Sequence, residues 1–100
     1  MGATNIEIKL PKAKYPTRSS VQIWYTNAVQ QATREYGTDC YNGTISTTRG
    51  ITFEEGTAFS DYGTAVNYTC DRTKKWGPVL AVTLTEKGTD FWFIGGWAAE

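Results

Sequence analysis

The chain has 100 residues, the size of one domain, and its ten basic and ten acidic residues cancel, which disfavours nucleic-acid binding. It contains no histidine, so it lacks the commonest general acid-base group and the commonest metal ligand. No apolar run approaches the roughly 18 residues of a membrane span, and the first residues lack the apolar segment of a signal peptide. We therefore expect a single domain over residues 1–100 with no membrane span, no metal and no cofactor.

The first third of the chain predicts two strands followed by a short helix. Residues 5–10 (NIEIKL) alternate apolar and polar side chains, as does the segment 21–26 (VQIWYT), which is typical of half-buried strands. The apolar spacing then changes to a helical period. Asn27 is suited to the N-cap and Gly37 to the left-handed position after the last turn. These features predict a helix over about residues 28–36.

From residue 40 onward the pattern predicts an antiparallel meander. Gly88 within TEKGTD suits the left-handed position of a tight hairpin turn. The last strand has aromatic or apolar side chains on both faces, so we expect it to be a central strand covered on both sides. The expected strands are CYNGTIST (40–47), GITFEE (50–55), AVNYTC (65–70), VLAVTLT (79–85) and FWFIGGW (91–97).

These elements predict an α+β domain that is mainly β. The expected architecture is a twisted antiparallel sheet, or a small sandwich, of six to seven strands with one short helix at about 28–36. Trp24, Trp92 and Trp97 are expected to pack in the core. Glu54 and Glu55 are adjacent on a predicted strand, so their side chains should face opposite sides.

The two cysteines, Cys40 and Cys70, are expected to form a disulfide. Such a bridge would close a loop of about 31 residues, which stabilises a fold by about 3.7 kcal/mol in the chain-entropy estimate. Two possible glycosylation triplets begin at Asn42 and Asn67, and they favour a secreted, extracellular protein. The alternative is a pair of buried free thiols in a cytosolic protein.

The sequence offers no recognisable catalytic set, so we do not expect an enzyme. Without histidine, neither a Ser-His nor a Cys-His pair can form, and no phosphate-binding loop is present. Four aspartates, at positions 39, 61, 71 and 90, could meet in space as the carboxylate pair of a small hydrolase, but their spacing gives no reason to pair any two.

A binding site is better supported, because aromatic and planar polar side chains meet in one loop. Asp71, Arg72 and Trp76 provide a hydrogen-bonding carboxylate, a guanidinium and an aromatic plate within six residues, as sugar recognition requires. Tyr41 is next to Cys40, so the disulfide would bring it close to Asp71. The loop with Asp61 and Tyr62 could form another side of the binding site. The alternative role of Trp76 is to cover one end of the core.

These residues predict a small secreted recognition domain that binds carbohydrate at an aromatic-rich loop edge. The alternative is a secreted inhibitor or effector module that binds a protein partner through the same tyrosines and tryptophans. A carboxylate-dependent hydrolase is the third hypothesis. The neutral net charge and an open sheet edge would also permit a homodimer.

Overall fold

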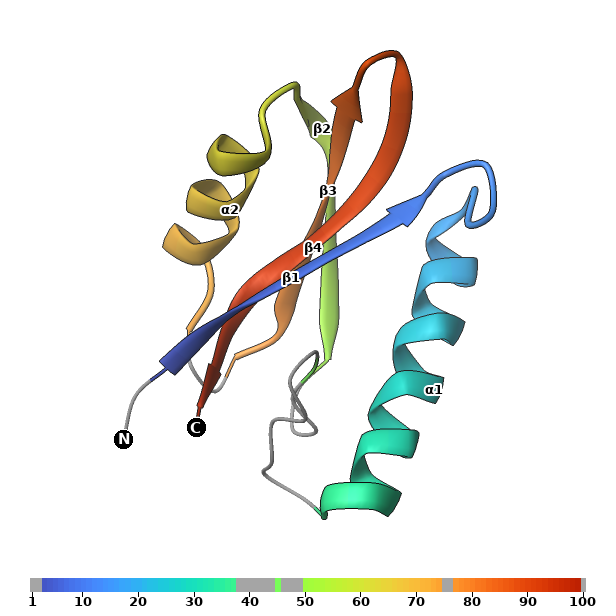
Figure 1. Ribbon diagram of the computed structural model, residues 1–100, viewed down its shortest axis with the longest axis vertical. Coiled ribbons are helices and arrows are strands. Elements are labelled where there is room, and N and C mark those ends of the chain that lie inside the picture. The colour runs from blue at the N-terminus through green and yellow to red at the C-terminus, as the bar shows by residue number, and fades with distance from the viewer. Residues whose placement is uncertain (1–2, 38–44, 46–49, 75–76, 100) are drawn as a thin grey trace.

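The computed structural model describes residues 3–37, 45, 50–74 and 77–99, which fold into a four-stranded mixed sheet with one helix on each face (Figure 1). The predicted α+β class, mainly β, is confirmed. The predicted six to seven strands and single helix are wrong, because the described residues form four strands and two helices. In chain order these are β1 (Ala3–Pro11), α1 (Arg18–Tyr36), β2 (Ile51–Phe59), α2 (Tyr62–Asp71), β3 (Val79–Glu86) and β4 (Thr89–Ala99).

The strand order explains why the helices lie on opposite faces of the sheet. The order is β1-β4-β3-β2, with β4 antiparallel to both neighbours and β2 parallel to β3. The crossover through α1 joins β1 at one edge of the sheet to β2 at the other edge. The crossover through α2 then runs in the opposite direction, from β2 to its neighbour β3. Because crossovers between parallel strands are right-handed, two that run in opposite directions place their helices on opposite faces.

The last strand, β4, is central, as the sequence predicted. It lies between β1 and β3, and its side chains alternate between two apolar clusters. Trp92 and Ile94 face α1, whereas Phe91 and Phe93 face α2. The hairpin that joins β3 to β4 turns at Lys87 and Gly88, both with positive φ (51° and 78°), which confirms the predicted tight turn with Gly88 in the left-handed position.

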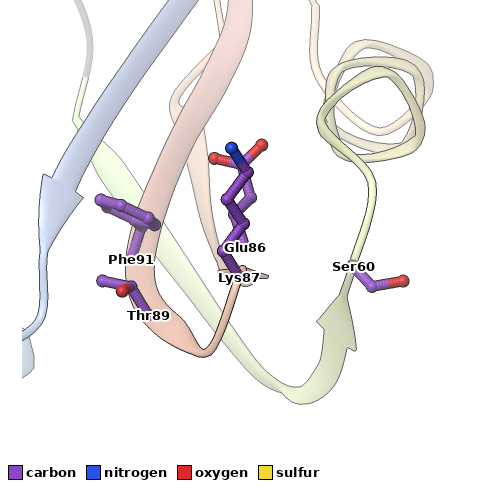
Figure 2. A pocket seen from close by; sticks show the side chains of 5 residues that line it. All are labelled: Ser60, Glu86, Lys87, Thr89 and Phe91. Atoms are coloured by element: carbon purple, nitrogen blue, oxygen red, sulfur yellow. The ribbon is translucent and has the colours of Figure 1, made fainter.

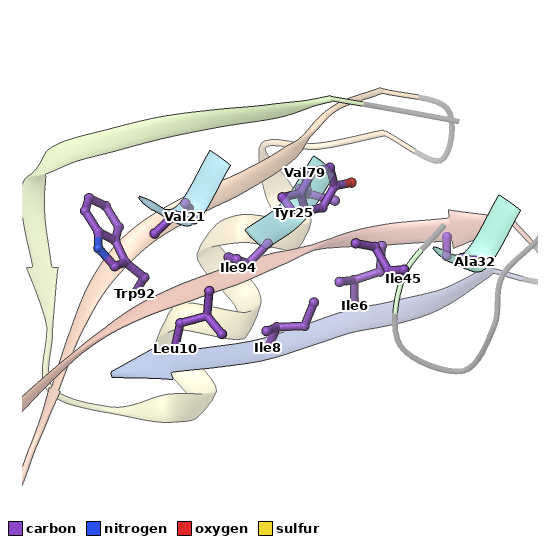
Figure 3. Packing of buried hydrophobic residues seen from close by; sticks show 12 residues of the cluster. Ile6, Ile8, Leu10, Val21, Tyr25, Ala32, Ile45, Val79, Trp92 and Ile94 are labelled. Carbon is purple, nitrogen blue, oxygen red and sulfur yellow. The ribbon is translucent and has the colours of Figure 1, made fainter. Parts of the chain in front are cut away.

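The larger cluster fills the space between the sheet and α1 (Figure 3). The Trp92 ring is buried there, and its Nε1 donates to the Tyr15 carbonyl at 2.9 Å. Trp24 packs at the side of the cluster, and Trp97 is half-buried, so core packing is confirmed most fully for Trp92. The buried residues of this cluster are Ile6, Ile8, Leu10, Val21, Tyr25, Ala32, Ile45, Val79, Ala81, Trp92, Ile94 and Ala98.

The helix α1 begins ten residues earlier than predicted and includes the segment 21–26, which was expected to be a strand. Thr17 forms a capping box with Ser20, and each accepts a hydrogen bond from the backbone N–H of the other. Val21 and Tyr25 are buried four residues apart, which is the spacing of one helix face. Val21 and Tyr25 also fit the two-residue period of a strand, so the apolar pattern of a six-residue segment did not distinguish a helix from a strand.

The segment 65–70 was also expected to be a strand and is instead part of α2. The Asp61 carboxylate caps this helix by accepting from the Thr64 N–H at 2.9 Å. Ala65 and Thr69 are buried four residues apart against the sheet, while Asn67 is exposed. Of the predicted strand 40–47, only residue 45 lies within the described residues.

A bulge in β2 lets one edge strand contribute to both faces of the sheet. Phe53 pairs with Ala81, but Ala58 pairs with Thr83, so five steps of β2 match two steps of β3. The bulge therefore adds three residues to β2, and an odd number of extra residues exchanges the faces of the sheet to which odd- and even-numbered side chains point. Phe53 therefore packs in the α1 cluster, and Phe59 packs in the α2 cluster.

Neither helix in the described part of the chain combines the length and apolar character needed to cross a bilayer.

Candidate functional site

The helix α2 separates the residues that the sequence assigned to one site. Asp61 and Tyr62 lie at its start, and Asp71 and Arg72 lie at its end. Ten helical residues extend about 15 Å, so these two pairs do not share one ligand-binding surface. Tyr41, Trp76 and Cys40 lie outside the described residues.

Cys70 carries a free thiol, so the expected disulfide with Cys40 finds no support. The thiol is half-buried, and burial is the main cause that raises its pKa. The Cys70 carbonyl accepts a hydrogen bond from Trp97 Nε1 at 3.0 Å, which ties the end of α2 to β4. The structure thus gives this residue a role in positioning the end of the helix.

Arg72, Tyr68 and Glu54 form a connected group beside the end of α2. The Arg72 Cζ atom lies 3.7 Å from the centroid of the Tyr68 ring, which is a close cation–π contact. The Tyr68 hydroxyl donates a hydrogen bond to Glu54 Oε1, which raises the pKa of Tyr68 and keeps the phenol protonated. Among the described residues, the aromatic ring that lies against Arg72 is Tyr68.

The bulge of β2 positions Glu54 in this group. Glu54 points toward α2, whereas its neighbour Glu55 bonds to Arg18 of α1, on the other side of the sheet. The prediction that the two carboxylates face opposite sides is therefore confirmed. The Tyr68 ring also packs against Phe59 of β2, with ring centroids 4.8 Å apart, so Tyr68 is fixed both by its hydroxyl and by its ring.

A groove of about 290 Å³ runs beside this group, and we call it the Arg72 groove. Its apolar surface comes from Pro78 and Leu80 at the start of β3. The hydroxyls of Thr52 and Thr73 donate to backbone carbonyls, at 3.2 and 2.8 Å, and so present their lone pairs as acceptors. The lining residues are Thr52, Glu54, Arg72, Thr73, Lys74, Gly77, Pro78 and Leu80.

The Arg72 groove carries an excess of positive charge. Over the described ranges, the ion pairs are Lys9 with Glu86 and Arg18 with Glu55, and neither involves a cation of the groove. Arg72 and Lys74 both line the groove, and its carboxylate, Glu54, already accepts a hydrogen bond from a tyrosine. The groove can therefore donate several hydrogen bonds to an anionic group and accept hydrogen bonds at Glu54.

The other end of α2 lies near a wider hollow of about 550 Å³ at the β3–β4 hairpin (Figure 2). Its Glu86 carboxylate is bonded to Lys9 at 2.7 Å, and the same ammonium lies 4.7 Å from the Phe91 ring centroid. Close by, the Tyr62 hydroxyl donates to Glu7 at 2.8 Å. These charged groups already bond to one another, so this hollow offers a ligand less than the Arg72 groove does. It is lined by Ser60, Glu86, Lys87, Thr89 and Phe91.

The sequence reasoning missed Tyr68, Glu54 and Lys74 as site residues. Tyr68 and Arg72 are four residues apart, which brings their side chains together only on a helix, and this segment was expected to be a strand. A helical assignment of residues 62–71 would have indicated the pair. The contact with Glu54 is non-local and has no signal in the spacing of residues.

Among the described residues, no group of three histidine, cysteine, aspartate or glutamate side chains could hold a metal ion. Comparisons with protein-family models, with curated proteins and with solved structures found no match to this chain.

Proposed function

We propose that this protein is a carbohydrate-recognition domain and that it binds a sugar in the Arg72 groove. The observation that carries the proposal is the fixed group of Arg72, Tyr68 and Glu54 beside an apolar surface. A sugar ring needs an apolar contact for its C–H face and planar polar groups for its hydroxyls. The groove volume of about 290 Å³ is close to the lower limit of ligand sites, which suits a single sugar unit.

Each polar group of the groove has a distinct part in this proposal. The Arg72 guanidinium has five N–H donors, and its stacking on Tyr68 holds the plane in one orientation. Glu54 accepts hydrogen bonds from sugar hydroxyls, with its own position held by the Tyr68 hydroxyl. Pro78 and Leu80 supply the apolar surface.

The charge of the groove favours an acidic sugar over a neutral one. Arg72 and Lys74 line the groove with a single carboxylate, Glu54. A planar carboxylate matches the fork of an arginine, and charge-assisted hydrogen bonds of this kind are roughly twice as strong as neutral ones. We therefore propose uronic acids and other carboxylated sugars as the ligand class, and an extracellular location where such glycans occur.

A glycan array with matched acidic and neutral members tests this proposal. Wild-type protein should bind carboxylated glycans, and Arg72→Ala should abolish the signal. Arg34→Ala is the matched control, because Arg34 is an exposed arginine in the last turn of α1. Inorganic sulfate and phosphate as competitors distinguish sugar recognition from general anion binding. A blank array with wild-type protein would overturn the proposal.

A protein-binding module remains the second candidate, because two large apolar side chains of α1 are exposed. Ile23 is 62% exposed and Tyr36 is 56% exposed. Ile23 also lines a hollow of about 420 Å³ with Arg18 and Phe53. An exposed apolar side chain beside such a hollow is a candidate anchor for a protein partner. A blank glycan array combined with one tight partner, lost on Ile23→Glu but retained by Arg72→Ala, would favour this candidate.

A further inference from the structure

The outer edge of β1 is an open strand edge within the described part of the chain. β1 pairs with β4 on one side, and no described strand lies on its other side. The register with β4 is unbroken from Ala3↔Ala99 to Pro11↔Phe91. Unlike β1, the other edge strand, β2, is interrupted by its bulge, which protects an edge against pairing.

One hydrogen bond shows which backbone groups of β1 point outward. The Lys12 N–H donates to the Asp90 carbonyl at 3.0 Å, in continuation of the β1–β4 register. Backbone groups of an antiparallel strand point alternately to its two sides. Even-numbered residues of β1 therefore bond to β4, and the N–H and C=O groups of Asn5, Glu7 and Lys9 point away from it. Pro11 ends this edge because it has no N–H.

We propose that the outer edge of β1 pairs with β1 of a second copy of this chain, antiparallel about a two-fold axis. The odd-numbered residues of β1 have outward backbone groups, so each must lie opposite an odd-numbered residue of the second copy. This condition is met when the two-fold axis passes through a residue and its own copy, and not when it passes midway between two neighbouring residues. An axis at Glu7 would place two carboxylates opposite each other, which is destabilising. An axis at Ile8 instead places Glu7 of each copy opposite Lys9 of the other, which gives two pairs of opposite charge.

Charge complementarity selects this register. On the face toward α2, each Glu7 lies opposite a Lys9 of the other copy. The Glu7 Oε1 atom accepts from the Tyr62 hydroxyl at 2.8 Å, and Lys9 Nζ bonds to Glu86 at 2.7 Å. The second carboxylate oxygen of Glu7 is available for the pair across the axis. Because Glu86 lies on β3, beyond β4, the Lys9 side chain turns from Glu86 to Glu7 of the second copy when the dimer forms.

The opposite face of β1 also matches itself in this register. Ile8 meets Ile8 of the second copy, and Ile6 meets Leu10. These three side chains belong to the α1 cluster, so pairing would extend one apolar layer across the axis (Figure 3). Asn5 lies opposite Pro11 at each end of the paired segment. This segment, residues 5–11, is short, so the dimer should form with modest affinity, at protein concentrations of about 10 µM to 1 mM.

Charge reversal tests the register without relying on a single variant. Glu7→Lys alone would place lysines opposite lysines, and Lys9→Glu alone would place glutamates opposite glutamates. Each variant should be monomeric in sedimentation equilibrium at concentrations where wild type dimerises. An equimolar mixture of the two variants should form a heterodimer, because every pair across the axis is then opposite in charge. A mixture that stays monomeric, or wild type that stays monomeric at about 1 mM, would overturn the proposal.

A proline pair tests the backbone hydrogen bonds independently. The Glu7 N–H points away from β4, so Glu7→Pro removes an edge donor but no bond within the sheet. This variant should remain folded by circular dichroism and lose dimerisation by at least tenfold in Kd. Ala3→Pro is the control, because the Ala3 N–H also points away from β4 but its partner in this register would be Ala13, beyond the end of β1. Equal loss in both variants would contradict the Ile8-centred register.

Discussion

Thr69 of α2 lies directly against Gly95 of β4. A Cβ atom added to Gly95 would lie 2.8 Å from Thr69 Cβ and 2.7 Å from a ring carbon of Phe93, closer than such atoms approach in proteins. Thr69 is fully buried, and its hydroxyl donates to the Ala65 carbonyl at 3.0 Å. The missing side chain at Gly95 therefore lets α2 approach the sheet, and it sets the position of the helix end that carries Arg72.

Gly95→Ala should lower the free energy of unfolding by about 1–3 kcal/mol, because the added methyl group overpacks the contact between α2 and β4. Urea denaturation followed by circular dichroism measures the change. Gly56→Ala is the matched control, since an added Cβ there meets nothing within 4 Å. Equal stability of the two variants would contradict the close approach of α2 to Gly95.

Tyr68→Phe should weaken sugar binding roughly tenfold while leaving the melting temperature close to that of wild type. The ring would still pack against Phe59 and beneath Arg72, but Glu54 would lose the hydroxyl that holds its carboxylate. Calorimetric titration with the best ligand of the glycan array measures the effect. Unchanged affinity would show that the position of Glu54 does not matter to the ligand.

The protein should lose stability at alkaline pH because of Tyr62. Burial, the hydrogen bond to Glu7 and nearby negative charges raise the pKa of Tyr62 to about 12. In the unfolded chain a tyrosine ionises near pH 10, so the native state holds this proton more tightly. The contribution of Tyr62 to the free energy of unfolding is therefore complete below about pH 10 and disappears as the pH rises to about 12.

Thermal unfolding at several alkaline pH values measures this loss. Tyr62→Phe should flatten the alkaline decline in melting temperature, whereas Tyr36→Phe should leave it unchanged, because Tyr36 is 56% exposed. An alkaline decline that is identical in wild type and Tyr62→Phe would show that Tyr62 does not control it.

Asp61 should produce the opposite dependence at acid pH. The Thr64 backbone N–H, and then the Thr64 hydroxyl, lower the pKa of Asp61 below its usual 3.8. The native state therefore favours the ionised cap, and this stabilisation is present at neutral pH and lost as the pH falls through the lowered pKa. Asp61→Asn keeps a capping oxygen and should reduce the acid decline in melting temperature. Asp61→Ala should lower the melting temperature at neutral pH as well.

The sequence predicted the strands better than the helices, and the reason lies in particular residues. The segment 5–10 alternates apolar and polar side chains, the segments 79–85 and 91–97 are largely apolar runs typical of buried strands, and each of the three lies within a strand. The segments 21–26 and 65–70 are rich in β-branched and aromatic residues, whose strand preference is overridden when the chain needs a helical crossover between parallel strands. The parallel pairing of β2 with β3 is a tertiary feature that local patterns do not reveal.

The candidate site could be predicted only where its residues are close in sequence. The charged segment after Cys70 was identified as a binding loop, and Arg72 and Lys74 of that segment do line the groove. Glu54 comes from the bulge of another strand, and its contact with Tyr68 depends on how α2 lies over the sheet. Such non-local contacts follow from packing, so residue spacing alone did not indicate them.

The most direct test of the proposed function is a map of amide chemical-shift changes during titration with a carboxylated sugar. We expect saturable shifts in the amides of Thr52, Glu54 and Thr73, and their loss in Arg72→Ala but not in Arg34→Ala. Saturable shifts centred on Ser60 and Thr89 at the hairpin hollow, or shifts that never saturate, would contradict sugar recognition in the Arg72 groove.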